Sequence, residues 1–222
     1  MDFKAAGKTV TLYPAERGNA PLIILNSFSG DGRDVVDAMT EIGCGECSLA
    51  SVGDLNWDHE MSPWYCPPLR QEDSPCTGGA DEYLEVLISG ILPEIRGKIP
   101  GDPAFIGIAG YSLAGLFALY ALYQTDVFSR AASMSGSLWY PDFRAYADRH
   151  ELKRKPDRLY FSVGDKEART RNHMLRTVQE NTEYLVACYR RMGIPAEYEL
   201  NEGNHFKDAA LRSAKGIAAL VK

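Results

Sequence analysis

One stretch of the chain constrains the fold more than any other, because a buried strand, a tight turn and a helix follow one another there. Residues 104–109 are almost entirely apolar and predict a short strand buried on both faces. The helix after the turn is predicted from apolar residues at helical spacing, namely Leu113, Leu116, Phe117, Leu119, Tyr120 and Tyr123. Ser112 therefore lies in a sharp turn between a strand and a helix.

Ser112 is the candidate nucleophile of the chain. A serine in such a turn holds strained backbone angles, and small residues are needed where the strand and the helix pass close together. Gly110, Ala114 and Gly115 meet this steric requirement, although the usual pattern G-x-S-x-G has glycine where Ala114 stands. The alternative for Ser112 is an ordinary N-cap of the helix that follows.

The composition predicts one globular domain over residues 1–222 that binds neither nucleic acid nor a membrane. The chain has 222 residues, 45% of them hydrophobic, and a net charge of −6. No block of Lys or Arg supplies a basic face for nucleic acid, and no run approaches the roughly 18 apolar residues of a membrane span. Met1-Asp2-Phe3-Lys4 begins no long apolar segment, so we expect a cytoplasmic protein.

The five cysteines predict neither a disulfide framework nor a metal site. Cys44 and Cys47 form a C-x-x-C, but no second such pair or paired histidine follows at ligand spacing. We expect reduced cysteines, with Cys47 on the strand that runs through Val52. Asp58-His59-Glu60 has no partner at metal-ligand spacing, so no metal and no cofactor are expected.

Strands and helices alternate along the sequence, which predicts an α/β fold with a largely parallel sheet and helices on both faces. Segment 53–79 is too long for a plain connector and is expected to overhang a site. The expected strands are 8–13 (an edge strand), 21–25, 47–52, 104–109, 130–134, 158–163 and 196–200, and the expected helices are 33–42, 83–97, 113–123, 171–192 and 206–220.

A nucleophilic serine needs a general base, and His205 is the candidate. His59 lies in the long loop, His150 in a charged stretch and His173 in a predicted helix. His205 follows the last strand, and reactive groups of open α/β sheets gather at the carboxyl ends of the strands. The other interpretation of His205 is a solvated histidine on a surface turn.

The third group, which would orient the base, is expected after the strand that ends at Val163. Asp165 and Glu167 both stand there. We favour Glu167, because it is longer and lies farther along the loop toward His205, while Asp165 is also suited to a turn or a helix cap. Spacing does not separate the two carboxylates, and a Ser–His dyad without an acid is a further alternative.

Two backbone N–H groups are expected to bind the oxyanion that forms when a serine attacks a carbonyl. Leu113 follows the nucleophile at a helix N-terminus and is the first candidate. The second donor is expected in the turn after strand 21–25, where Phe28 is preferred and Ser27 is the alternative.

Four motifs resemble, in order and spacing, those of the Putative esterase family of α/β hydrolases, which includes siderophore esterases, feruloyl esterases and S-formylglutathione hydrolases. They are Gly110-Tyr111-Ser112-Leu113-Ala114-Gly115-Leu116, Ser135-Gly136-Ser137-Leu138-Trp139-Tyr140, Val163-Gly164-Asp165-Lys166-Glu167 and Gly203-Asn204-His205-Phe206. The resemblance implies an α/β-hydrolase fold with Ser112 as nucleophile, Glu167 as acid and His205 as base. Ala114 departs from the family pattern, and at this chain length we expect no separate lid or siderophore-binding domain.

Aromatic residues on the predicted loops near the carboxyl edge are expected to line a pocket for an acyl or aryl group. They are Trp57, Trp64, Tyr65, Trp139 and Tyr140, and completion of the core is the alternative for each. The sequence as a whole predicts a serine hydrolase that cleaves small-molecule carboxylic esters through an acyl-enzyme. An acyltransferase of the same fold, or a catalytically silent binding module on this scaffold, are the alternatives.

Overall fold

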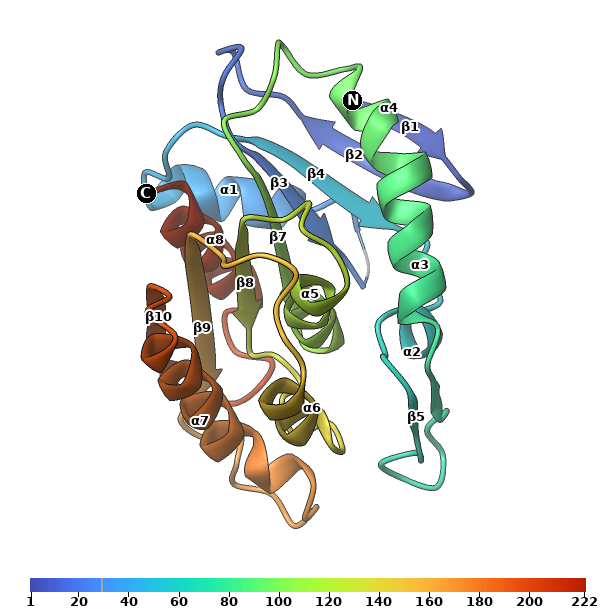
Figure 1. Ribbon diagram of the computed structural model, residues 1–222, viewed down its shortest axis with the longest axis vertical. Coiled ribbons are helices and arrows are strands. Elements are labelled where there is room, and N and C mark those ends of the chain that lie inside the picture. Colours follow the sequence, from blue (N-terminus) through green and yellow to red (C-terminus); the bar gives the residue numbers. More distant parts are fainter. Residues whose placement is uncertain (29) are drawn as a thin grey trace.

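In residues 1–28 and 30–222, which the computed structural model describes, eight strands form one central sheet (Figure 1). Their order across the sheet is β1-β2-β4-β3-β7-β8-β9-β10. The strands are β1 (Asp2–Ala5), β2 (Lys8–Tyr13), β3 (Leu22–Asn26), β4 (Ser48–Gly53), β7 (Ile106–Tyr111), β8 (Arg130–Met134), β9 (Arg158–Gly164) and β10 (Ala196–Asn201). From β4 to β10 all neighbours are parallel, whereas β1–β2 and β2–β4 are antiparallel.

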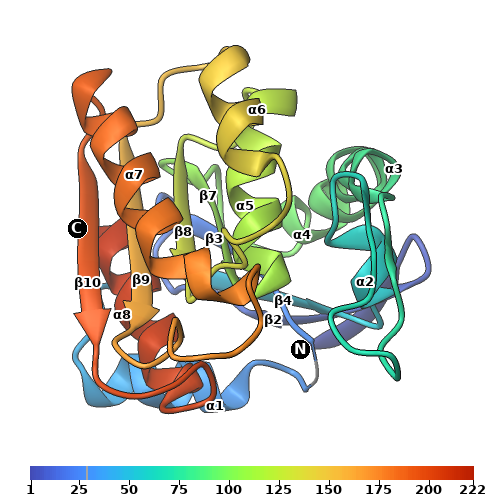
Figure 2. The same ribbon diagram turned by 90° about the horizontal axis from the view of Figure 1, so that it is seen from below.

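Helices cover both faces of the sheet (Figure 2), and each face has its own apolar core. On one face α1 (Arg33–Glu41) packs beside α8 (Ala209–Val221). The other face carries α3 (Ala80–Val86), α4 (Leu92–Arg96), α5 (Leu113–Gln124), α6 (Phe143–Arg149) and α7 (Val178–Arg191). Strands such as β3 are buried along their whole length because helices lie on both sides, which confirms the α/β architecture with a mostly parallel sheet.

The long segment after β4 contains short regular elements instead of a plain loop. It holds α2 (Trp57–Glu60) and a hairpin of β5 (Tyr65–Cys66) with β6 (Cys76–Thr77). An ion pair of 2.6 Å between Lys8 Nζ of β2 and Glu60 of α2, both largely buried, fixes this segment to the sheet. The five cysteines carry free thiols, and Cys47 directly precedes β4.

Strand β2 is not the edge strand that its alternation predicted, because β1 pairs along its outer side. The expected helix 83–97 is divided into α3, a π-helical turn (Leu87–Ile91) and α4. Pro93 lies in the first turn of α4 and has no N–H to donate to the preceding turn, which favours an irregular helix there.

The expected helix 171–192 begins later than predicted, with a 3₁₀ turn (Leu175–Thr177) before α7. The side-chain oxygen of Asn172 accepts hydrogen bonds from the backbone N–H of Met174 (2.9 Å) and Leu175 (3.2 Å). These local bonds compete with helical ones, so the chain turns there before the helix starts. Helix α6 was not predicted, because its seven residues are too few to show a periodic pattern.

The turn between β7 and α5 brings backbone against backbone. Ser112 has φ 59° and ψ −123°, which is strained for a residue with a side chain. A methyl group on Gly110 would lie 2.2 Å from the carbonyl carbon of Ala114, and one on Gly115 would lie 2.9 Å from the Gly110 oxygen. Ala114 fits the fifth position of the G-x-S-x-G motif because the residue opposite its methyl group is Gly110, which has no side chain.

Replacing Gly110 with Ala is expected to lower the free energy of unfolding by about 3 kcal/mol, because β7 and α5 would have to move apart. Urea unfolding followed by circular dichroism measures this change. The control is Gly97→Ala, at a position with φ −68° whose nearest atoms lie 3.6 and 3.7 Å from the added carbon. It is expected to change stability by less than about 1 kcal/mol, and equal effects of the two substitutions would contradict the packing argument.

Candidate active site

The sheet registers bring the candidate residues together at one edge. Gly110 of β7 lies opposite Asn26 of β3, and Gly164 of β9 lies opposite Asn201 of β10. Parallel strands end at the same edge of a sheet, so the turns that follow β3, β7, β9 and β10 converge there. Ser112, Glu167 and His205 are each carried by one of these turns.

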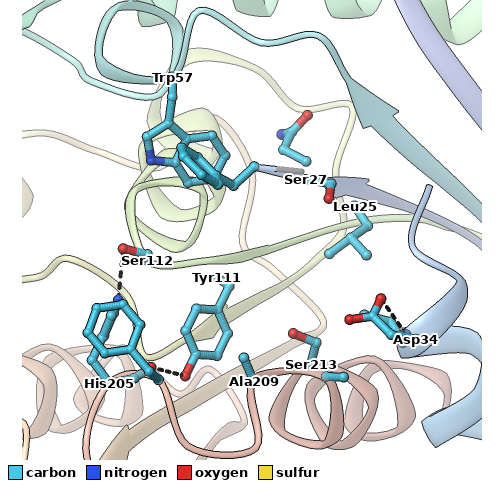
Figure 3. Close-up of a pocket in the computed structure, with 14 residues that line it drawn as sticks. Leu25, Ser27, Asp34, Trp57, Tyr111, Ser112, His205, Ala209 and Ser213 are labelled. Atoms are coloured by element: carbon cyan, nitrogen blue, oxygen red, sulfur yellow. Dashed lines mark hydrogen bonds between the residues drawn. The ribbon is translucent and has the colours of Figure 1, made fainter. Parts of the chain in front are cut away.

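Ser112, His205 and Glu167 form one chain of hydrogen bonds. Ser112 Oγ lies 3.1 Å from His205 Nε2 (Figure 3), and His205 Nδ1 lies 2.7 Å from Glu167 Oε2. With its proton on Nδ1, the neutral imidazole donates to Glu167 and accepts from the serine hydroxyl through Nε2. Ser112 occupies the N-cap position of α5, but its hydroxyl contacts His205 instead of capping the helix.

The carboxylate of Glu167 is buried, with 4% of its side chain exposed. Its Oε1 accepts hydrogen bonds from Gly164 N–H (2.6 Å), Ser135 Oγ (2.8 Å) and Arg212 Nη1 (3.1 Å). Burial by itself raises the pKa of Glu167, but the hydrogen bond and charge of His205, with the bonds from Gly164 and Ser135, hold that pKa below its ordinary value. Glu167 is therefore ionised and acts as an acceptor near neutral pH.

Asp165, the alternative acid, has a different task in the structure. Its Oδ1 accepts a hydrogen bond of 2.6 Å from the backbone N–H of Gly203. Backbone bonds from Asp165 to Asn201 (2.8 Å) and from Lys166 to Gly203 (3.0 Å) join the same two turns. Asp165 thus fixes the turn that carries His205, and Glu167 is the carboxylate that reaches the imidazole.

The two candidate oxyanion donors flank the serine. Leu113 is the first residue of α5, so its N–H has no acceptor one turn earlier in the helix. The N–H of Ser27 donates to Val52 O at 2.9 Å, which leaves Phe28 as the candidate in the turn after β3. Phe28, Ser112 and Leu113 line the same cavity.

Two cavities meet at Ser112, and Phe28, Ser112 and Trp57 line both. The larger cavity, of about 480 Å³, extends from the serine between β3, α1 and α8 (Figure 3). The smaller cavity, of about 330 Å³, lies against the hairpin and α2. The larger is lined mainly by apolar groups, including Leu25, Val35, Tyr111, Phe206, Ala209 and Ala210, and the smaller by groups that include Asp58, Cys66, Leu69, Asp73, Cys76 and Trp139.

The predicted aromatic lining is partly wrong. Trp139 lines the smaller cavity and Trp57 lines both. Tyr140 is only 2% exposed and donates its hydroxyl to the backbone oxygen of Trp64, while Trp64 Nε1 donates to Pro141 O at 2.9 Å. Trp64 and Tyr140 line neither cavity, because their rings pack against each other and into the core behind the site.

Sequence reasoning missed Arg212 and the side-chain roles of Tyr111 and Ser135. Arg212 Nη1 donates to Glu167 Oε1, and Tyr111 donates its hydroxyl to His205 O at 2.7 Å (Figure 3). One signal was present, because Arg212 stands on the same helical face as Gly216 and Leu220, which are buried. A charged residue on a buried face indicates a buried partner of opposite charge.

The residues that the structure describes contain neither a cluster of possible metal ligands nor a membrane-spanning helix. Among them, no three or more His, Cys, Asp and Glu side chains are grouped so that they could bind a metal ion. Within the same residues, no helix combines the length and the apolar character needed to cross a bilayer.

The sheet order, the turn after β7 and the helices on both faces define the chain as an α/β hydrolase. The model of the family described as Putative esterase matches residues 51–207, and the chain belongs to this family. Membership makes the chain a carboxylic-ester hydrolase by class.

Known proteins are similar to the chain in sequence or in fold. Over 204 residues the chain is 22% identical to the uncharacterized protein YbbA of Bacillus subtilis. The aligned residues cover 86% of this chain and 82% of YbbA. Among solved structures, an IroE-like serine hydrolase from Shewanella oneidensis is 16% identical, with a TM-score of 0.77 over 96% of this chain and 75% of its own. Siderophore hydrolase EstA from Aspergillus nidulans is 20% identical, with a TM-score of 0.76 over 96% of this chain and 89% of its own.

The two neighbouring carboxylates can be distinguished by amide substitution. Glu167→Gln is expected to lower kcat for an aryl ester on the order of 10³- to 10⁴-fold, because a neutral amide does not stabilise the imidazolium. Asp165→Asn keeps the oxygen that accepts from Gly203 and is expected to cost less than about tenfold. Initial rates with a p-nitrophenyl ester measure both, and a larger loss in Asp165→Asn would reverse the assignment.

Proposed function

We propose that this protein is a serine hydrolase that cleaves small-molecule carboxylic esters through an acyl-enzyme. The observation that carries the proposal is the hydrogen-bonded chain Ser112–His205–Glu167 at the junction of two cavities. In this proposal Ser112 is the nucleophile, His205 the general base and then the general acid, and Glu167 the group that orients and stabilises the imidazole.

In the first half of the reaction, Ser112 Oγ attacks the ester carbonyl while its proton passes to His205 Nε2. The carbonyl oxygen becomes an oxyanion that the N–H groups of Leu113 and Phe28 bind. When the tetrahedral intermediate collapses, the bond to the alcohol oxygen breaks and His205 gives that oxygen the proton. The products of this step are a free alcohol and an acyl-Ser112 ester.

In the second half, water takes the place of the alcohol. His205 removes a proton from the water as it attacks the acyl group, and returns that proton to Ser112 Oγ as the carboxylic acid leaves. The side chain of His205 is 30% exposed, which supports access of water to the imidazole. The same acyl-enzyme would transfer its acyl group to another alcohol if that alcohol bound better than water.

The two cavities support a substrate whose halves lie on opposite sides of Ser112. The larger cavity suits an apolar half, aryl or aliphatic, since most of its lining is carbon. Phe28 and Phe206 are 72% and 84% exposed at its wall, and a bound apolar group would cover both rings.

The protein as a whole fits a small-molecule enzyme of a reducing compartment. Its five cysteines carry free thiols, which suits the cytoplasm, and its net charge of −6 disfavours nucleic acid as a partner. We treat the sheet and the helices on its two faces as one α/β-hydrolase domain.

Ser112→Ala is expected to lower hydrolysis of a p-nitrophenyl acyl ester by at least about 10⁴-fold without unfolding the protein, because the acyl-enzyme can no longer form. The rate of p-nitrophenol release measures the loss, and labelling by a fluorophosphonate probe reports the nucleophile directly. Ser137→Ala is the matched control, because its hydroxyl lies 3.4 Å from Ser112 Oγ but makes no contact with His205 in the proposed mechanism. It should keep the labelling.

Three outcomes separate the alternatives. Full activity in Ser112→Ala would refute the proposed nucleophile. A folded wild-type protein that neither turns over esters nor reacts with the probe would favour a catalytically silent binding module. Formation of a new ester in the presence of added alcohol, in place of free acid, would identify an acyltransferase.

Phe206→Ala is expected to raise KM about tenfold for aryl and medium-chain esters and to leave acetate esters nearly unchanged, because only the larger apolar groups reach the ring. A series of p-nitrophenyl esters of increasing chain length measures the dependence. Met192→Ala removes another exposed apolar side chain, at the far end of α7, and is the control. The same rise in KM for every chain length would contradict this placement of the apolar half.

A further inference from the structure

Arg212 of α8 is fully buried behind the proposed catalytic residues. Its side chain is 1% exposed, and it is among the largest fully buried side chains of the protein. Burying a guanidinium costs several kcal/mol unless ion pairs and hydrogen bonds replace water. The contacts of Arg212 therefore indicate what this charge does.

The first set of contacts fixes the acid. Arg212 Nη1 donates to Glu167 Oε1 (3.1 Å) and to Ser135 Oγ (3.0 Å), and Ser135 Oγ in turn donates to the same Oε1 (2.8 Å). With the N–H of Gly164, Oε1 has three donors. The carboxylate is thus held with Oε2 directed at His205.

The second set of contacts fixes the base. Arg212 Nη1 lies 3.3 Å from the hydroxyl of Tyr111, which donates to the backbone oxygen of His205 at 2.7 Å. Arg212 Nη2 donates to the backbone oxygen of Glu202 at 3.0 Å, in the same turn as His205. One guanidinium thereby reaches both partners of the Glu167–His205 pair from a helix that follows them in the sequence.

We propose that Arg212 is a positioning residue of this hydrolase: its guanidinium fixes Glu167 directly and His205 through Tyr111, and its positive charge sets the lower pH limit of activity. This inference rests on the proposed function of Ser112, His205 and Glu167. Arg212 lies outside the chain Ser112–His205–Glu167, but it fixes the geometry of the acid–base pair and sets the pH range in which the pair works.

The effect of the Arg212 charge follows from the different partners of the two carboxylate oxygens of Glu167. One carboxylate oxygen meets a permanent cation, Arg212, and the other meets the imidazole, which becomes a cation during the reaction. Arg212 compensates part of the negative charge that would otherwise favour imidazolium before the substrate binds. The negative field that Glu167 exerts at His205 Nδ1 is therefore weaker than that of a carboxylate without Arg212, and this is the physical basis for the expected change in the pH range of activity.

Other titratable groups lie around this pair and contribute to its field. Tyr111 of β7 faces both Arg212 and Glu167. On β10, Tyr198 lies within electrostatic range of Glu167, and Glu199 lies within electrostatic range of Arg212.

The acidic groups nearby have partners of their own. Glu199 is paired with Lys215 and Tyr160, and in the turn before α8 Glu202 pairs with Lys207. Asp165 is bound to the Gly203 N–H. Arg212 is the cation in direct contact with Glu167 from α8.

The test compares pH profiles of kcat/KM for a p-nitrophenyl ester in the wild type, Arg212→Met and Arg212→Lys. Arg212→Met removes the charge at similar length, and we expect kcat/KM at its maximum to fall about 10- to 100-fold and the midpoint of the acidic limb to rise by about one pH unit. Arg212→Lys keeps the charge but loses the forked geometry, so kcat should fall with little movement of the midpoint.

Two further variants separate geometry from charge. Ser135→Ala removes one donor to Oε1 and no charge, so the midpoint should stay within about 0.3 pH unit of the wild type. Arg130→Met is the matched control for a lost structural arginine, because Arg130 also binds α8, through Leu220 O, but lies at the start of β8. Arg130→Met should leave the midpoint unchanged even if it lowers the melting temperature.

The outcomes are decisive in each direction. An unshifted acidic limb in folded Arg212→Met would overturn the charge role, and unchanged kcat in Arg212→Lys would overturn the geometric role. If Arg212→Met does not fold, Arg212→Lys and Ser135→Ala still test the proposal. A shift of a full pH unit in Ser135→Ala would show that hydrogen bonding, and not charge, sets the midpoint of the acidic limb. Failure of the proposed function itself is distinguishable, because Ser112 in the wild type would then not react with a fluorophosphonate probe.

Discussion

The contact between the end of β7 and the start of α5 is the constraint on which the site depends. Because Gly110 has no side chain, the backbone of Ala114 passes within contact distance and forces Ser112 into positive φ. In that conformation the serine hydroxyl is presented at the carboxyl edge of the sheet, and the first N–H of α5 lies beside it. The proposed nucleophile and one proposed oxyanion donor are thus products of a single steric feature.

The other half of the site depends on buried charge. Glu167 and Arg212 are almost completely excluded from solvent, and their contact gives each of them an opposite charge and one hydrogen bond in place of water. The pair lies between β9 and α8, whereas Ser112 lies after β7, and His205 contacts both Glu167 and Ser112. The sheet registers fix the distance between the two parts, since β7, β8, β9 and β10 are neighbours.

Much of the fold and of the candidate site could be predicted from local sequence. Strands such as β8 were predicted at their observed bounds, because apolar runs between turn residues are a short-range signal. Predictions failed where a local pattern had two physical explanations. Tyr140 and Trp139 are adjacent aromatics on one loop, and only packing shows that the first is buried against Trp64 and the second faces a cavity. Likewise, an alternating strand such as β2 does not reveal whether another strand pairs beside it.

The sequence by itself determined the order of strands and helices, the strained turn at Ser112 and the small set of residues able to act as base and acid, because steric demands and side-chain chemistry are local properties. Only the tertiary structure decided that Glu167 and not Asp165 meets His205, that the N–H of Ser27 is already bound to Val52, and that Arg212 stands behind the acid. These are contacts between segments far apart in the chain. Their distances follow from sheet register and helix packing, which no single stretch of sequence encodes.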